Sequence, residues 1–206
     1  MSLLLLKIFD LKGMKSHFLI LFVFILMGCA KEEDSYVPKP RGFNRINLPA
    51  VSYQKLKGDY PYEFEYSTSA LIQPDTFGLA EPYWIIIYYP SLEARIQLTY
   101  KNFGGDLQRL QAHTLDAFRL ADKHLIRATG KTEKIQAFKN GKKAVIIELE
   151  GEVPSHYQFY TTDTTKHFLR GAVYLMEVSK NDSLQPVIDF LKKDTQHLLH
   201  TLRWKK

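Results

Sequence analysis

The sequence predicts one α+β domain in which two helices cover a single antiparallel sheet of about seven strands. Three observations support this prediction. Apolar and polar residues alternate over several short segments, as in half-buried strands. Dipeptides that favour tight turns separate neighbouring segments, which indicates antiparallel hairpins. Two longer segments repeat apolar residues at helical spacing. The expected order is three strands, a helix, four strands and a helix.

The first three strands are expected at residues 62–66, 83–89 and 94–100. The first segment alternates with a period of two, Tyr-Glu-Phe-Glu-Tyr, and the second is a continuous run of β-branched and aromatic residues. The third segment alternates again, which is typical of a strand with one buried face. Pro90 and Ser91 separate the last two segments and predict a hairpin turn.

A helix is expected to follow these strands. Asp106 is a good N-cap, and Gly130 is expected to end the helix. Residues at helical spacing predict its buried face: Leu107, Leu110, Thr114, Phe118, Ala121 and Leu125.

Four further strands are expected at residues 135–139, 142–149, 156–162 and 167–178. Asn140-Gly141 separates the first two of them, and Asp163-Thr164 separates the last two. Both dipeptides favour tight turns, so two hairpins are expected.

The last helix is expected to begin near Ser183, which is a good N-cap, with Pro186 tolerated in the first turn. A largely apolar stripe at helical spacing predicts its buried face: Leu184, Val187, Ile188, Leu191, Thr195, Leu198, Leu199 and Leu202. Arg203 and the two lysines that follow Trp204 suit the negative end of the helix dipole.

Residues 1–28 are typical of a secretory signal peptide. Lys12 and Lys15 precede an uninterrupted apolar run at residues 18–27, which is about half of the roughly 20 residues that a membrane-spanning helix needs. The run ends in Leu-Met-Gly-Cys, which resembles a bacterial lipobox. We therefore expect Cys29 to receive a diacylglycerol and to become the first residue of the mature lipoprotein, with a further acyl chain such as palmitate on its amino group. The opposing interpretation is a buried core cysteine after a short transmembrane segment.

Residues 29–50 are expected to form a lipidated, proline-rich tether, and residues 51–206 the folded domain. The acidic run at residues 32–34 is either a solvated part of the tether or a signal for export to the cell surface. A start at Met14 would also give a signal peptide of conventional length, so the true start of the chain is open.

The composition excludes several classes of protein. The apolar share of 45% and the charged share of 24% are typical of a folded chain. The single cysteine excludes an intramolecular disulfide, a Cys-based zinc finger and a Cys-ligated iron–sulfur cluster. The formal charge of +6 is mild, and the leader contributes to it, so no nucleic-acid partner is expected. No phosphate-binding loop, nucleophile elbow or zinc-protease motif is present, so we expect neither an enzyme nor a cofactor.

The spacing of the histidines does not favour a metal site. His113 and His124 share one expected helix but lie about 16 Å apart at 1.5 Å rise per residue, which is too far to bind one ion. His197 and His200 are spaced i, i+3, but no carboxylate is expected near them on that helix face.

His156 and His167 flank the turn at Asp163, and this arrangement supports an alternative function. Two histidines and an aspartate on adjacent strands would form an acid–base group, in a hydrolase or in a small-ligand binder. The opposing interpretation is ordinary turn chemistry, in which Asp and Thr side chains bind their own backbone. Glu63 and Glu65 share one strand face, which we expect to face solvent rather than to form a catalytic pair.

Several segments resemble the gliding-motility lipoprotein GldD family. They are residues 38–49 (Pro-Lys-Pro-Arg-Gly-Phe-Asn-Arg-Ile-Asn-Leu-Pro), the tyrosine-rich residues 60–66, residues 158–174, which include Thr-Thr-Asp-Thr-Thr-Lys-His-Phe-Leu-Arg-Gly, residues 182–190, and Leu202-Arg203-Trp204. Together they cover most of the expected mature chain in order.

The resemblance implies a lipid-anchored protein of the cell envelope that is required for gliding motility and for type IX protein secretion. It implies no enzymatic activity. The expected location is the outer membrane, on its periplasmic face rather than at the cell surface, and the expected partners are the membrane and other gliding or secretion proteins. The order of elements also resembles the α/β/α sandwich of PsbP- and Mog1-type domains, which concerns the fold alone.

Three residues are candidates for docking a partner, because we expect them to be exposed: Arg41, His167 and Arg170. For Arg170 the opposing interpretation is a surface ion pair.

Overall fold

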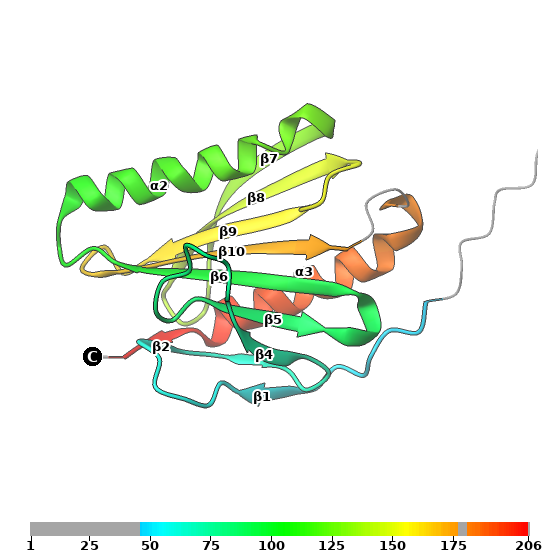
Figure 1. Ribbon diagram of the computed structural model, residues 1–206, viewed down its shortest axis with the longest axis horizontal. Coiled ribbons are helices and arrows are strands. Elements are labelled where there is room, and N and C mark those ends of the chain that lie inside the picture. Colours follow the sequence, from blue (N-terminus) through cyan, green and yellow to red (C-terminus); the bar gives the residue numbers. More distant parts are fainter. Residues whose placement is uncertain (1–45, 177–180, 206) are drawn as a thin grey trace, which may run out of the picture. The chain divides into compact units, whose positions relative to one another are not determined.

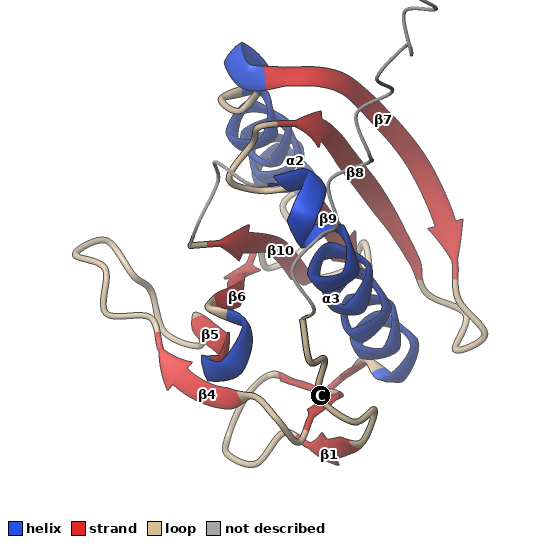
Figure 2. Ribbon diagram, turned by 90° about the vertical axis from the view of Figure 1, so that its right-hand side faces the viewer, coloured by secondary structure: helices blue, strands red, loops and turns tan. Residues whose placement is uncertain are grey.

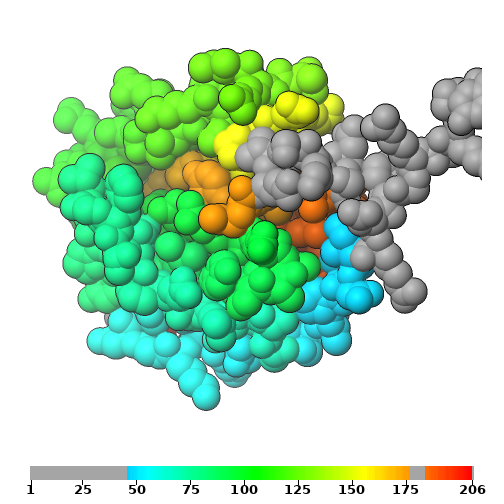
Figure 3. All heavy atoms as spheres, turned by 45° about the vertical axis from the view of Figure 1, so that its right-hand side comes forward, coloured from blue at the N-terminus to red at the C-terminus, as the bar shows by residue number. Residues whose placement is uncertain are grey.

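The structure is a computed structural model that describes residues 46–176 and 181–205. These residues belong to one compact unit, Phe43–Lys206 (Figure 3). Cys29 and Arg41 lie outside the described residues, as do the leader and most of the expected tether. Within the described ranges, no helix is both long and apolar enough to cross a membrane.

One large sheet dominates the fold, and all its neighbouring strands are antiparallel (Figure 1). The strand order is β4-β5-β6-β10-β9-β8-β7. The strands are β4 (Leu71–Pro74), β5 (Ile85–Tyr89), β6 (Ala94–Asn102), β7 (Ala128–Ala137), β8 (Lys143–Gly151), β9 (Tyr157–Thr162) and β10 (His167–Leu175). The predicted α+β class with an antiparallel sheet of seven strands is confirmed.

The first predicted strand does not belong to this sheet. It divides into β2 (Tyr62–Glu63), which pairs with β11 (Arg203–Trp204), and β3 (Glu65–Ser67), which pairs with β1 (Tyr53–Lys55). The short edge strand β4 takes the seventh place instead. Most of β4 is exposed, so its sequence lacks the alternation that indicates a half-buried strand.

Helix α2 (Leu107–Asp122) begins as predicted but ends earlier than predicted. The Asp106 carboxylate accepts the backbone N–H groups of Gln108 and Arg109, which confirms the N-cap. Gly130 does not end the helix. A short 3₁₀ helix (Leu125–Arg127) follows, and Gly130 lies inside β7, at a register shift opposite β8.

The predicted buried face of α2 is wrong at its two ends. Leu107 is 70% exposed, and Leu125 is exposed beyond the end of the helix. The most buried α2 residues are Ala117 and Ala121, whose small side chains allow the helix to lie close to the sheet.

Helix α3 (Asn181–Thr201) covers the other face of the sheet, as Figure 2 shows. Along β10, Leu169 packs in the main core with α3, whereas the adjacent Phe168 packs with Ala117 of α2. Because neighbouring strand residues point to opposite faces, α2 and α3 lie on opposite sides of β10. The predicted apolar stripe of the last helix is confirmed, and Leu191, Leu198 and Leu202 are buried.

Candidate functional site

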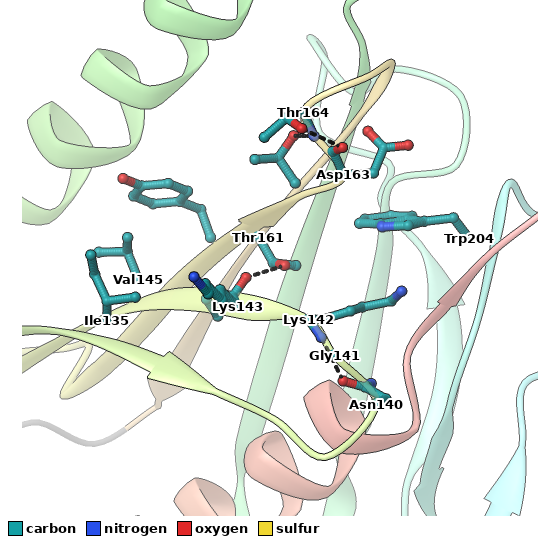
Figure 4. Close-up of a pocket in the computed structure, with 13 residues that line it drawn as sticks. Ile135, Asn140, Gly141, Lys142, Lys143, Val145, Thr161, Asp163, Thr164 and Trp204 are labelled. Atoms are coloured by element: carbon teal, nitrogen blue, oxygen red, sulfur yellow. Dashed lines mark hydrogen bonds between the residues drawn. The ribbon is translucent and has the colours of Figure 1, made fainter.

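A cavity of about 520 Å³ lies where the tips of two hairpins meet the C-terminal strand β11 (Figure 4). The β7–β8 turn, the end of β9 and β11 contribute its walls. Polar and aromatic side chains line it, among them Asn140, Lys142, Lys143, Thr161, Asp163 and Trp204. The hairpin tips at Asn140-Gly141 and Asp163-Thr164 are those that the sequence predicted.

The Asp163 carboxylate is held by the backbone of its own turn. Its Oδ1 accepts the N–H groups of Thr165, Lys166 and His167, each at 2.9 Å. Burial alone would raise the pKa of this carboxyl, but the three backbone donors lower it below its ordinary value. Asp163 therefore stabilises the turn as a carboxylate.

His167 lies beneath this turn and is only 3% exposed. Its Nδ1 is 2.7 Å from the Tyr100 hydroxyl, and its Nε2 is 4.0 Å from Oδ2 of Asp163. Its ring stacks on Trp204, with the centroids 5.1 Å apart and the planes 7° from parallel. Burial lowers the pKa of His167, despite the nearby Asp163, so the imidazole is neutral at neutral pH.

This cluster is suited to holding elements together rather than to catalysis. The neutral imidazole occupies one face of Trp204, and the Lys142 ammonium lies 5.9 Å from the centroid of the same ring. The Tyr100 hydroxyl is bound to His167, and burial raises its pKa. The arrangement fixes β11 against both hairpin tips.

The structure does not bring His156 to this cluster. His156 precedes β9 whereas Asp163 follows it, so the length of the strand, about 20 Å at 3.3 Å per residue, separates them. The Nδ1 of His156 is 3.1 Å from the carbonyl oxygen of Leu149. The prediction that His156, Asp163 and His167 share one site is therefore wrong.

The expectation that His167 and Arg170 are exposed is also wrong. Arg170 is 6% exposed, and its Nη2 donates to Oε1 of Gln158 at 2.6 Å. Both residues belong to β10, the central strand whose two faces are covered by α2 and α3.

No group of three or more potential metal ligands occurs within residues 46–176 and 181–205. The expectation that no carboxylate lies near the histidines of the last helix is wrong for His197. Its Nε2 is 2.9 Å from Oε2 of Glu65, which comes from β3. His197 also stacks on Tyr53, with the ring centroids 3.6 Å apart.

Two important polar residues were not predicted from the sequence. The side-chain amide of Asn140 donates to the carbonyls of Leu199, His200 and Leu202 at 2.8–3.2 Å, so the hairpin turn caps the end of α3. The other is Asp194, which is buried in the core and accepts the hydroxyl of Tyr89. The Asn-Gly signal predicts the turn but carries no information about the distant helix.

The model of the gliding motility lipoprotein GldD family matches residues 33–204, which include both hairpin tips and β11. The chain belongs to this family. The resemblance seen in the sequence is thus confirmed. As a GldD family member, the protein is an envelope-associated, lipid-anchored protein related to gliding motility.

The fold of this GldD family member is similar to the solution structure of cyanobacterial PsbP (CyanoP) from Synechocystis, with 11% sequence identity and a TM-score of 0.46. The match covers 77% of this chain and 95% of that chain. No curated protein matches the sequence.

Proposed function

We propose that this GldD family member is a structural or assembly component that gliding motility and type IX protein secretion require. The match to the family over residues 33–204 carries this proposal. In it, residues 1–28 direct export, Cys29 carries the lipid, residues 29–50 form the tether and residues 51–206 form the domain. The anchor lies in the outer membrane, and the domain faces the periplasm.

The geometry of the described residues favours binding over catalysis. The polar groups at the hairpin tips bind one another, and the most prominent of them hold β11 in place. His167 is neutral and stacked, and Asp163 is committed to three backbone donors. We therefore propose that the domain acts by contacting other envelope proteins and has no enzymatic activity.

We further propose that the loop between β4 and β5 makes one of these contacts. Phe77 is 73% exposed and Leu79 is 80% exposed. In Figure 2 this loop projects from the sheet on the side of α2. Large apolar side chains at the centre of an interface typically carry much of its binding energy. The loop replaces His167 and Arg170 as the expected docking surface, because those two residues are buried.

Several interactions hold this loop in shape, so its apolar tip is presented by a rigid support. The carboxylate of Asp75 accepts the backbone N–H of Phe77 at 3.0 Å and the Gln97 amide at 2.6 Å. The Trp84 indole N–H donates to the carbonyl of Tyr100 at 2.8 Å. A preorganised loop loses little conformational entropy when a partner binds.

Affinity purification from envelope extracts tests the proposal. The full-length lipidated protein should recover gliding or secretion proteins, and the double variant F77S/L79S should recover at least about tenfold less of them. L115S is the matched control, because Leu115 is an exposed leucine on α2 that lies outside the loop. The C29A variant should lose its membrane association.

The possible results separate the three parts of the proposal. Equal recovery by F77S/L79S and the wild type would overturn the loop as the docking surface. Recovery of no gliding or secretion protein by the wild type would overturn the assembly function itself. Continued membrane association of C29A would overturn Cys29 as the anchor.

A further inference from the structure

A buried arginine on the α2 side of the sheet has no carboxylate partner. Arg170 is 6% exposed, and its Nε has no hydrogen-bond acceptor. Among the described residues, no carboxylate oxygen lies within the 4.0 Å of an ion pair from its guanidinium. A buried charge is costly unless an opposite charge or several hydrogen bonds compensate it.

Gln158, the hydrogen-bond partner of Arg170, also has a buried donor without an acceptor. The Oε1 of Gln158 accepts from Arg170, which leaves the Nε2 of Gln158 as a second donor without an acceptor. Gln158 is 1% exposed and lies opposite Ala172 of β10, on the adjacent strand β9. Two buried side chains that are bonded to each other therefore each retain an unused donor.

Further positive charge lies on the strand next to β10, since Arg95 of β6 is opposite Tyr174 of β10. Arg95 is half-buried on β6, its Nε also lacks an acceptor, and its guanidinium lies 5.5 Å from the centroid of the Tyr174 ring. The His124 ring, just beyond α2, contacts the same tyrosine at 6.2 Å between centroids. Burial and then the charge of Arg170 lower the pKa of His124, which indicates that the two side chains are close.

No described acidic side chain compensates this charge. The carboxylate of Asp75, which reaches Gln97 on β6, is occupied by Gln97 and by the backbone of its own loop. Asp122, at the end of α2, forms an ion pair with Lys131 at 2.5 Å.

We propose that Arg170, Gln158 and Arg95 form a binding site for an oxyanion, a carboxylate or phosphate group that enters between the end of α2 and the sheet. An oxyanion accepts hydrogen bonds without needing to donate any, which suits two buried donors that lack acceptors. Its negative charge compensates Arg170, and a guanidinium matches the geometry of carboxylate and phosphate groups. This site goes beyond the proposed docking function and does not depend on it.

Thermal unfolding of the full-length protein in detergent tests the site. The probes are inorganic phosphate and acetate, each compared with chloride at equal ionic strength. A bound anion should raise the Tm saturably, by about 3 °C or more at saturation. Phosphate also stabilises proteins because it is excluded from their surface. Only the part of the Tm rise that saturates with anion concentration, and that a variant abolishes, therefore counts as binding.

Three variants separate binding from this general effect. R170Q and R95Q should abolish the saturable rise, and R95Q covers the case in which R170Q does not fold. R119Q is the matched control and should retain the rise, because Arg119 is exposed on α2. A rise with phosphate but not acetate would assign the site to phosphate groups, and the reverse would assign it to carboxylates.

The pKa of His124, followed by NMR, gives a second readout. An anion next to Arg170 cancels part of the charge that opposes protonation of His124, so the pKa should rise when the probe is added. An absent Tm rise, an equal rise in R95Q, or an unchanged pKa of His124 at saturating probe would each overturn the site.

Discussion

At the scale of single residues, the core contains a buried carboxylate whose charge is stabilised by hydrogen bonds from two tyrosines far away in sequence. Asp194 of α3 is 4% exposed and accepts the hydroxyls of Tyr53 and Tyr89, each at 3.0 Å. Burial raises the pKa of Asp194, although both hydroxyl groups favour its charged form. The two hydrogen bonds are therefore what makes the buried charge tolerable.

We expect Tyr89→Phe to destabilise the protein by about 1.5–3 kcal/mol at pH 7, because it leaves a buried charge with one fewer donor. Tyr53→Phe is the matched control. It should cost less, because Tyr53 is half-buried and water can replace its hydroxyl. Urea unfolding measures both differences. In an Asp194→Asn background Tyr89→Phe should cost less, and an equal cost in both backgrounds would contradict the role assigned to the charge.

The sequence could not predict these residues from local patterns. The helical stripe correctly predicts that Leu191 and Thr195 are buried, but Asp194 lies between them without any local sign of its partners. Likewise, nothing near Arg170 shows that α2 will cover it. A polar residue is expected at the surface by default, and the tertiary contacts that bury it come from elsewhere in the chain.

At the scale of elements, the β7–β8 turn also acts as the C-cap of α3. The Nδ2 of Asn140 donates to the last carbonyls of that helix, and its Oδ1 accepts the backbone N–H of Lys142 at 3.1 Å. One exposed side chain thus serves both the turn and the helix. The free energy that it contributes can be divided between the two by substitution.

We expect Asn140→Asp to reduce the free energy of unfolding by about 1–2 kcal/mol. An aspartate keeps the acceptor for Lys142 but loses the donors to the helix, and its charge is unfavourable at the negative end of the helix dipole. Asn140→Ala loses both contacts but adds no charge. Chemical denaturation measures each variant, and a neutral Asn140→Asp would contradict the capping role.

The hairpins marked by tight-turn dipeptides were predicted, whereas short strands without a local hydrophobic pattern were not. The hairpins at Asn140-Gly141 and Asp163-Thr164 are local, and the structure confirms them. β11 is two residues long and exists through pairing with β2, far earlier in the chain, and β1 is three residues long and pairs with β3. The prediction that Gly130 ends the helix was wrong because glycine also favours bulges, and Gly130 lies at a register shift of β7.

At the scale of the whole molecule, three histidines couple the stability of the fold to pH. His113 and His124 lie between α2 and the sheet, and His167 lies beneath the hairpin tip. Burial is the largest cause that lowers the pKa of each. Protonation of any one of them therefore favours the unfolded chain.

We expect the free energy of unfolding to fall as the pH decreases from about 6.5, the ordinary histidine pKa. Above that pH both states are neutral, and the full stability is present. Between pH 6.5 and the lowered folded-state values, the unfolded chain binds more protons, so stability is lost as the pH falls through this window. Urea unfolding at intervals from pH 7.5 to 5 measures the loss.

Asp194 acts in the opposite direction, since its raised pKa stabilises the folded state as the pH falls. The decisive quantity is therefore the difference between the wild type and each histidine variant at the same pH, in which the contribution of Asp194 cancels. For His113→Gln, His124→Gln and His167→Gln, this difference should change with pH only below about 6.5. Gln111→Ala is the control, because Gln111 is exposed on α2 and carries no titratable group, and its difference should stay constant. If all four differences stayed constant, protonation of these histidines would not be what couples the fold to pH.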